Sequence, residues 1–398
     1  MKKFTRKSIQ QARMVVVLTG LVLFGFFIGA RQDMIKKILS PASVAGVKSV
    51  DPKKLTQMLK QKNFTLINVH TPYEGEIAKT DTFIPYSEMV ANSTSLPSDK
   101  NALVVLYCKT GRMSEEAVQA VEKLGYTNVM HLAGGMDAWQ KQGGQLLDLS
   151  KIDAEVLPAE GVELPIAWGD LGPKLVNLGV IDLAKFKETV KPTPEQEKLL
   201  TQGGDAKIVI DRNNSQFVLD VLWALGLAQK SLAYSEGPMG KDYAKDVGNF
   251  ASTGGWPLAR GQAVDYLNRY ELIPLTPQQQ SKVAEIAKNV YRPCCGNSTW
   301  FPDCNHGMAA LALIELLVSA EVDDATIYRK VLGVNSIWFS QNYLAVATYF
   351  ARQGTPWNQV DAKMVLGADY SSAKGAGEIM KKVGPLPNQP KSAGGCGA

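Results

Sequence analysis

The stretch LVVLYCKTGRMSEEA, residues 103–117, decides how the first part of this chain folds. Its apolar run, residues 103–107, predicts a buried strand, and Gly111 predicts a tight turn after it. Ser114 and the two glutamates behind it predict the start of an amphipathic helix. Cys108 therefore lies between a strand and a helix N-terminus. Turn amides and the positive end of the helix dipole favour a thiolate there, so this sulfur is expected to be nucleophilic.

The sequence around this cysteine has further features at fixed spacing, namely CKTGRMS at 108–114, Ala117, LGY at 124–126, Val129, LAGG at 132–135 and Trp139. Together these residues resemble the second half of a single rhodanese domain. The resemblance implies an α/β fold for residues 47–145. It also implies that Cys108 accepts a sulfane sulfur as a persulfide and passes it to another nucleophile, with no cofactor required for the transfer.

The resemblance implies a catalytic site in this loop, formed by Cys108, Lys109, Gly111, Arg112 and Ser114. Cys108 would carry the sulfur, and the loop amides with Arg112 or Lys109 would hold the anion. A Cys-x5-Arg phosphatase needs an arginine where this chain has Ser114, so the loop matches the sulfurtransferases. The expected partners are a small-molecule sulfur donor and a thiol acceptor.

Strand and helix signals alternate through this part of the chain, which independently predicts a parallel sheet with helices on both faces. The predicted strands are 64–69, 83–85, 103–107 and 127–131, and the predicted helices are 52–60, 114–124 and 136–140. Rhodanese domains usually read Asp-Val-Arg after the first core strand, where this chain has Asn68-Val69-His70. His70 is interpreted either as a general base near the loop or as a structural group, and His131 as structural.

The N-terminus carries an uncharged apolar run, residues 14–30, behind five basic residues in segment 1–13. The run is long enough for a transmembrane helix, and the denser positive charge before it favours a cytoplasmic N-terminus. We therefore expect a single-pass anchor in the cell membrane, with the body of the protein outside the cytoplasm. The alternative is a signal peptide cleaved near Ala30, which would leave the protein secreted or periplasmic.

The length of 398 residues allows two or three domains, and the net charge of +5 gives no case for nucleic acid as a partner. Beyond the rhodanese-like domain the pattern changes to helices separated by proline and glycine, and strand-like runs nearly disappear apart from residues 208–210. We predict a linker at 146–165, an all-α domain at 166–384 and a flexible tail at 385–398. The predicted helices of this domain are 172–178, 183–190, 194–202, 214–228, 261–270, 277–291, 307–320, 323–332, 340–352 and 372–383.

A second group of reactive residues lies between two predicted helices of the all-α domain and consists of Cys294, Cys295, Cys304 and His306. Thiolates and imidazole are the ligands that zinc and copper prefer, so the group is a candidate site for Zn or Cu. Adjacent cysteines do not easily reach one tetrahedral ion. A disulfide from Cys304 to Cys294 or Cys295, or a persulfide-accepting thiol site, are the alternatives.

The sequence thus predicts a membrane-anchored, extracytoplasmic sulfurtransferase of the rhodanese type. The alternative is a non-catalytic protein that binds metal or senses thiols and uses the rhodanese fold as an interaction module. The sulfur donor, the acceptor and any protein partner stay undefined at this level.

Overall fold

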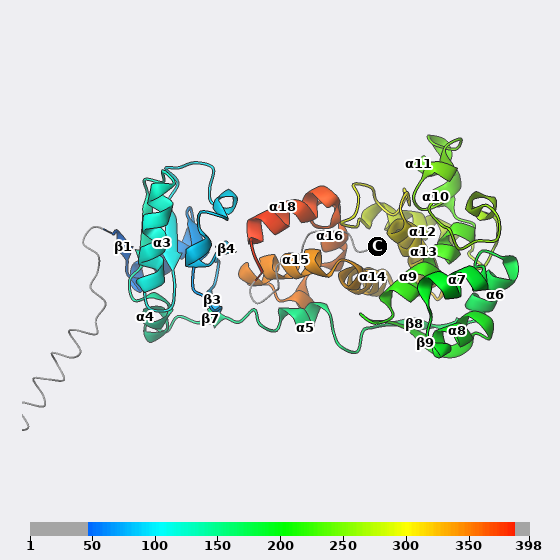
Figure 1. Cartoon of the computed structure of the whole chain (residues 1–398), viewed down its shortest axis with the longest axis horizontal. Helices are drawn as coiled ribbons and strands as arrows, with labels where there is room; N and C mark the ends of the chain where they lie inside the picture. Colours follow the sequence, from blue (N-terminus) through cyan, green and yellow to red (C-terminus); the bar gives the residue numbers. More distant parts are fainter. Residues whose placement is uncertain (1–46, 387–398) are drawn as a thin grey trace, which may run out of the picture. The chain divides into compact units, whose positions relative to one another are not determined.

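A computed structural model describes residues 47–386 of the chain (Figure 1). The predicted membrane anchor at 14–30 and nearly all of the predicted tail at 385–398 lie outside these residues. Among the described helices, none combines the length and the apolar character that crossing a membrane requires.

The first part of the described chain is an α/β domain around a five-stranded sheet with the strand order β1-β6-β5-β2-β4. Strands β4, β2, β5 and β6 run parallel, as the alternating pattern predicted. Strands β3 and β7 form a separate two-stranded antiparallel sheet. The elements are β1 (Ser49–Val50), α2 (Pro52–Lys60), β2 (Thr65–Asn68), β3 (Glu76–Ile77), β4 (Thr82–Phe83), β5 (Val104–Tyr107), α3 (Arg112–Lys123), β6 (Val129–Leu132), α4 (Gly135–Lys141) and β7 (Leu146–Leu147), with 3-10 turns at Tyr86–Glu88 and Ser93–Ser95.

Strand β5 lies inside this sheet, and all four of its residues are buried. Its alternate side chains Val105 and Tyr107 join a core cluster with residues of α2 and α4. The other two, Val104 and Leu106, are equally buried, and α3 packs against β5 and β6. Because side chains alternate across a strand, a continuous apolar run requires cover on both faces, and helices supply it.

The rest of the described chain is a helical region with one two-stranded sheet. Its elements are α5 (Ile152–Val156), β8 (Val162–Gly169), α6 (Leu171–Leu178), α7 (Leu183–Val190), α8 (Pro194–Thr201), β9 (Gly204–Ile210), α9 (Ser215–Ala228), α10 (Leu232–Ser235), α11 (Pro238–Lys241), α12 (Pro277–Asn289), α13 (Asn305–Ser319), α14 (Asp324–Trp338), α15 (Ser340–Arg352), α16 (Ala362–Leu366), α17 (Ala368–Ser371) and α18 (Ala373–Val383), with 3-10 turns at Val247–Asn249, Ala263–Tyr266 and Trp357–Gln359. Helices α9 and α13 are buried almost all round and pack against each other, so they form the centre of this region.

The prediction of an all-α domain is corrected by β8 and β9, which pair antiparallel. Residues Leu164 and Trp168 of β8 are buried and alternate with exposed ones, which is the pattern of a half-buried strand. Pro165 concealed this strand in the sequence, because proline removes a ladder donor and argues against a central strand. Here the proline is tolerated in a strand whose pairing is irregular between Glu163 and Ala167.

The predicted helix at 261–270 is also corrected, since only a 3-10 turn forms there, at Ala263–Tyr266. The N–H groups of Asn268 and Tyr270 donate to Leu227 and Ala228 at the end of α9 instead of to their own segment. Asn268 adopts a positive φ of 57°, which a continuing α-helix does not allow. Tertiary hydrogen bonds therefore replace the local ones.

The interval predicted as a linker, 146–165, contains β7, α5 and the first half of β8. Leu149, Ile152 and Val156 are buried and belong to the core of the helical region. The interval is therefore folded and packs on the helical region. The polar residues between its apolar side chains made it look like a linker in the sequence.

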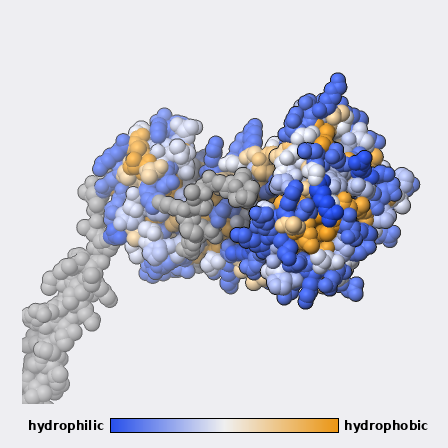
Figure 2. All heavy atoms as spheres, turned by 45° about the vertical axis from the view of Figure 1, so that its right-hand side comes forward, coloured by the Kyte–Doolittle hydropathy of each residue, from blue (hydrophilic) through white to orange (hydrophobic). Residues whose placement is uncertain are grey.

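The surface drawn in Figure 2 is mostly hydrophilic, with separate patches of hydrophobic residues. The large hydrophobic side chains that are exposed among the described residues are Val90, Leu178, Tyr243, Val264, Met364 and Met380. They belong to different elements of the chain. No single apolar face therefore dominates the surface of the described residues.

Candidate active site

Cys108 follows β5 directly, at the carboxyl end of the strand, where loops of parallel sheets carry their reactive groups. Its Sγ accepts a hydrogen bond from the backbone N–H of Gly111 at 3.1 Å. Gly111 adopts φ 107°, a conformation that favours glycine, and it is the N-cap of α3. The predicted turn is thus present, and it directs an amide and a helix N-terminus at the sulfur. The residue is buried, with only 1% of its surface exposed.

A second glycine fixes the loop from the other side. The N–H groups of Met136 and Asp137, in the first turn of α4, donate to the carbonyl oxygens of Cys108 and Lys109 at 2.9 and 3.0 Å. A Cβ on Gly135 would lie 2.2 Å from the Cys108 oxygen, so only glycine allows this approach. The backbone of the cysteine is therefore held by α4 while its side chain faces α3.

Ser114 is fully buried and lies behind the sulfur. Its Oγ is 3.5 Å from Cys108 Sγ and donates to the Gly111 oxygen at 2.8 Å. Ser114 Oγ also lies 3.4 Å from Nδ1 of His131. The other ring nitrogen of His131, Nε2, lies 3.5 Å from Glu115. Burial lowers the pKa of His131, against the charge of Glu115, which favours a neutral imidazole. A polar chain thus runs from the sulfur into the domain.

The two basic residues predicted to hold the anion are each paired with a carboxylate. Lys109 Nζ contacts Glu74, and the Arg112 guanidinium contacts Glu116 one turn further along α3. Both side chains are about half exposed and lie at the surface. A bound anion would compete with these carboxylates. Anion binding by either basic residue stays a prediction.

His70 connects to this network through Glu74, whose Oε1 lies 3.4 Å from its Nε2. This separation is short enough for an ion pair. Neither ring nitrogen of His70, however, has a hydrogen-bond partner among the described residues. The hydrogen bond to Lys109, with a smaller effect of His70, lowers the pKa of Glu74. The histidine at the end of β2 is therefore linked to the loop through a carboxylate, which the sequence did not indicate.

The comparisons with known proteins agree with this geometry. The rhodanese-like domain family matches residues 51–142. A sulfurtransferase of Allochromatium vinosum is 30% identical over 102 residues, covering 24% of this chain and 92% of that protein. The thiosulfate sulfurtransferase PspE of Escherichia coli is 35% identical over 72 residues, or 18% of this chain and 68% of that protein.

This chain belongs to the rhodanese family. The probable adenylyltransferase/sulfurtransferase MoeZ of Mycobacterium tuberculosis is 35% identical over 130 residues, which is 31% of each chain. This chain therefore spans about a third of the length of that relative. The similarity concerns the rhodanese domain, and the matched residues, 51–142, end before the helical region.

Within the rhodanese domain, sequence reasoning assigned no role to Gly135 and interpreted His131 as structural. The double glycine at 134–135 was one of the residues that carried the resemblance, but its steric role against the Cys108 carbonyl depends on how α4 meets the loop. The contact of His131 with Ser114 joins residues from β6 and α3, and sequence spacing alone contains no signal for it.

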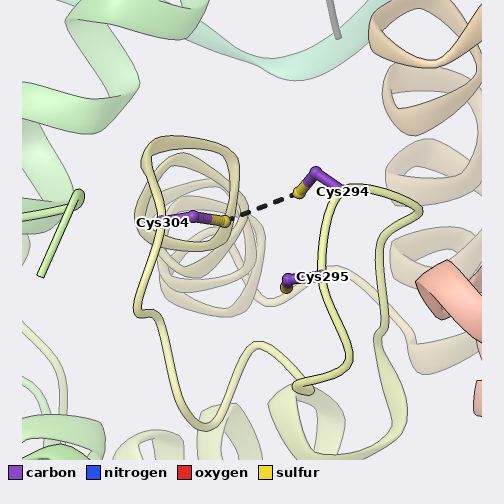
Figure 3. Close-up of side chains that lie close together, drawn as sticks. All are labelled: Cys294, Cys295 and Cys304. Carbon is purple, nitrogen blue, oxygen red and sulfur yellow. Dashed lines mark hydrogen bonds between the residues drawn. The ribbon is translucent and has the colours of Figure 1, made fainter. Parts of the chain in front are cut away.

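The second predicted group lies in the helical region, between α12 and α13, and its three thiols come together (Figure 3). The Sγ atoms of Cys294, Cys295 and Cys304 all lie within 4.8 Å of one another, and the described cysteines are free. Cys294 and Cys304 face each other with 3.6 Å between their sulfurs. This hydrogen bond and the Arg292 guanidinium hold the pKa of the Cys304 thiol well below its usual range.

His306 is not among the ligand atoms that lie within 4.8 Å of one another, so its role as a ligand stays a prediction. Cys304 caps α13, and His306 lies in the first turn of that helix. Its Nδ1 lies 2.9 Å from Asn305, and its ring packs on Phe339 with 4.6 Å between the ring centroids. Burial lowers the pKa of His306 to about 4, so the imidazole is neutral at neutral pH. The described contacts of this ring are therefore made through Nδ1 and through its aromatic face.

Proposed function

We propose that this protein is a sulfurtransferase that carries sulfane sulfur on Cys108 and delivers it to a thiol. The observation that carries the proposal is the position of the Cys108 sulfur at the end of β5 in a rhodanese domain, with the Gly111 amide at 3.1 Å. The A. vinosum and E. coli relatives named as sulfurtransferases support it. These two matches cover 24% and 18% of this chain, so the proposal concerns the rhodanese domain.

The transfer has two steps, loading of sulfur onto Cys108 and delivery of that sulfur to a thiol. In the first, the Cys108 thiolate attacks the outer sulfur of a donor such as thiosulfate, which forms an S–S bond and releases sulfite. In the second, a thiol attacks the outer sulfur of the Cys108 persulfide, regenerates the Cys108 thiolate and leaves as a persulfide. The Gly111 amide stabilises the negative charge on the cysteine sulfur at the start and at the end of this cycle.

The test compares the full chain with Cys108→Ser in thiosulfate-to-cyanide and thiol-dependent sulfide assays. Cys396, in the predicted tail, supplies the matched cysteine control as Cys396→Ser. We expect Cys108→Ser to abolish turnover and the addition of one sulfur atom seen by mass spectrometry, while the control retains both. Equal activity of the two variants would refute the proposal. Alkylation of Cys108 by iodoacetamide, blocked by pre-loading with thiosulfate, checks that this buried sulfur is reachable.

We also propose that residues 14–30 anchor the protein in the cell membrane with its body outside the cytoplasm. The apolar run and the basic residues before it support this proposal. We expect the full chain to stay in carbonate-washed membranes and a chain that begins at residue 47 to be released. We also expect protease added outside intact spheroplasts to digest the part of the chain that follows residue 30. A full chain recovered in the cytoplasmic fraction would contradict the proposal, and a mature N-terminus near residue 31 would establish the cleaved signal peptide instead.

A further inference from the structure

Three thiols converge in the loop that leads into α13, far along the chain from the rhodanese loop (Figure 3). Their Sγ atoms lie within 4.8 Å of one another, and one pair is 3.6 Å apart. Three sulfurs bonded to one metal ion at about 2.3 Å stand roughly 4 Å from each other. The three cysteines therefore reach a shared ion with shifts of less than about 1 Å, even though two of them are adjacent in sequence.

The other polar groups of the loop are already engaged. Asp303 accepts from Arg292 Nη2 at 3.0 Å through Oδ1 and from Asn297 Nδ2 at 2.7 Å through Oδ2. The ring of His306 packs on Phe339. Among the residues that the structure describes, the group of possible ligand atoms here contains sulfur alone. The site is thus a three-sulfur site.

The charge next to the sulfurs is fixed by Arg292, which is fully buried. Its Nε donates to Cys304 Sγ at 3.2 Å, and its other nitrogens are held by the carbonyl oxygens of Asn297 and Phe301. The guanidinium lies against Gly307, where a Cβ would be 2.4 Å from Nη2. Because the arginine cannot leave this place without losing all these bonds, it keeps its guanidinium beside the three sulfurs.

We propose that Cys294, Cys295 and Cys304 bind one copper(I) ion in three-sulfur coordination. Thiolates select soft ions such as copper(I), and a site with three donors suits copper(I) better than zinc, which takes four ligands in structural sites. Three thiolates and one monovalent ion leave a charge of −2, beside which Arg292 places one positive charge and Asp303, its ion-pair partner at 3.0 Å, one negative charge. The proposal is independent of sulfur transfer at Cys108.

The test uses the full chain, reduced and free of oxygen, titrated with copper(I) against a chelator of known affinity and separately with zinc(II). We expect one copper(I) per chain, and X-ray absorption is expected to show three sulfur neighbours and no nitrogen or oxygen neighbour. Each of Cys294→Ser, Cys295→Ser and Cys304→Ser should lower the affinity by at least tenfold. Cys108→Ser makes the same chemical change elsewhere and should leave copper binding unchanged.

Folding is controlled within the same set of variants. Serine is a good N-cap, so Cys304→Ser keeps the cap on α13 that Cys304 now provides. A further variant, Gly307→Ala, alters no thiol but displaces Arg292, and it should weaken copper binding. Gly296→Ala in the same loop is its control, because a Cβ there meets nothing within 4 Å.

Three results would overturn the proposal. These are a reduced chain that binds no copper(I), copper binding that survives all three cysteine substitutions, and a zinc(II) complex tighter than the copper(I) complex with a nitrogen or oxygen ligand. Loss of copper binding in the cysteine variants together with full retention in Cys108→Ser would establish the site.

Discussion

Arg352 and Glu76 form a buried, two-pronged ion pair between α15 and β3. Arg352 Nε and Nη2 donate to the two carboxylate oxygens of Glu76, each at 2.8 Å, and neither side chain is more than 2% exposed. The remaining nitrogen, Nη1, donates to the carbonyl oxygens of Asp81 and Val383 at 3.0 and 2.9 Å. The pair therefore joins residues that are 276 positions apart in the chain and connects the helical region to the rhodanese domain.

Loss of one partner of this pair should be costly, because it leaves an uncompensated buried charge. We expect Arg352→Met to lower the free energy of unfolding by about 3–5 kcal/mol. Removing both charges in Glu76→Leu/Arg352→Met should recover most of that loss, since an apolar pair of similar volume fills the same space. Urea unfolding of the wild type and the variants measures this. A double variant as unstable as Arg352→Met alone would contradict it.

The ion pair is also connected to the residues before Cys108 by a hydrogen bond. Ile77, next to Glu76, donates its N–H to the hydroxyl of Tyr107 at 3.0 Å, and Tyr107 is the residue before Cys108. Thiosulfate turnover at a temperature well below the unfolding midpoint should therefore fall in Arg352→Met and return in the double variant. Unchanged turnover in the single variant would show that the contact serves stability alone.

Gly135→Ala should disrupt the reactive loop, because the new Cβ would lie 2.2 Å from the Cys108 oxygen. Gly143→Ala is the matched control, since Gly143 also has a positive φ but a Cβ there meets nothing within 4 Å. Both variants share the strain of a left-handed residue, about 1–2 kcal/mol. We expect Gly135→Ala alone to lose most sulfur-transfer activity. Equal activities in the two variants would show that the approach of α4 to the loop is dispensable.

The sequence predicted the strand, the cysteine and the glycine turn of this loop, because those depend on local patterning around Cys108. It did not predict that Arg112 pairs with Glu116 or that Lys109 pairs with Glu74, since side-chain pairing at a surface depends on which carboxylates the fold brings near. In the helical region, the predicted helix starts at 194 and 277 are confirmed, and the structure shows capping boxes there at Thr193 and Thr276.

Strand β8 and the β3–α15 ion pair required tertiary information instead. Pro165 argued against a strand, and nothing near Arg352 in the sequence points to a carboxylate in another domain. The thiols of Cys294 and Cys304 lie together, as the prediction of one site implied, whereas the contact of His306 with Phe339 joins residues that sequence spacing does not relate.

The pairing of Arg112 with Glu116 gives a test of anion binding. If Arg112 holds the donor anion, Glu116→Gln should free it and lower the KM for thiosulfate, and Arg112→Gln should raise the KM, each by roughly two- to fivefold. Both effects should shrink at high salt because the groups are exposed. Glu122→Gln, exposed on the same helix, is the control. A KM that none of the three substitutions changes would remove Arg112 from the proposed site.

Glu315 gives the chain a pH-dependent stability. It lies in α13 and is fully buried, and burial raises its pKa from 4.5 to about 8, against a weaker effect of Ser231. Below pH 4.5 the carboxyl is protonated in both the folded and the unfolded chain. As the pH rises from 4.5 to 8, the unfolded chain releases this proton while the folded chain keeps it, so stability falls through that window by at most about 1.4 kcal/mol per pH unit.

Glu315→Gln removes this titration while keeping the size and shape of the side chain. The unfolding free energy of the wild type minus that of Glu315→Gln should therefore decline between pH 5 and pH 8 and become constant above the folded pKa. Glu285→Gln on α12 replaces an exposed carboxylate and should run parallel to the wild type. Urea midpoints at several pH values measure all three proteins. Parallel curves for the wild type and Glu315→Gln would mean that the carboxyl of Glu315 ionises in the folded chain as readily as it does in the unfolded one.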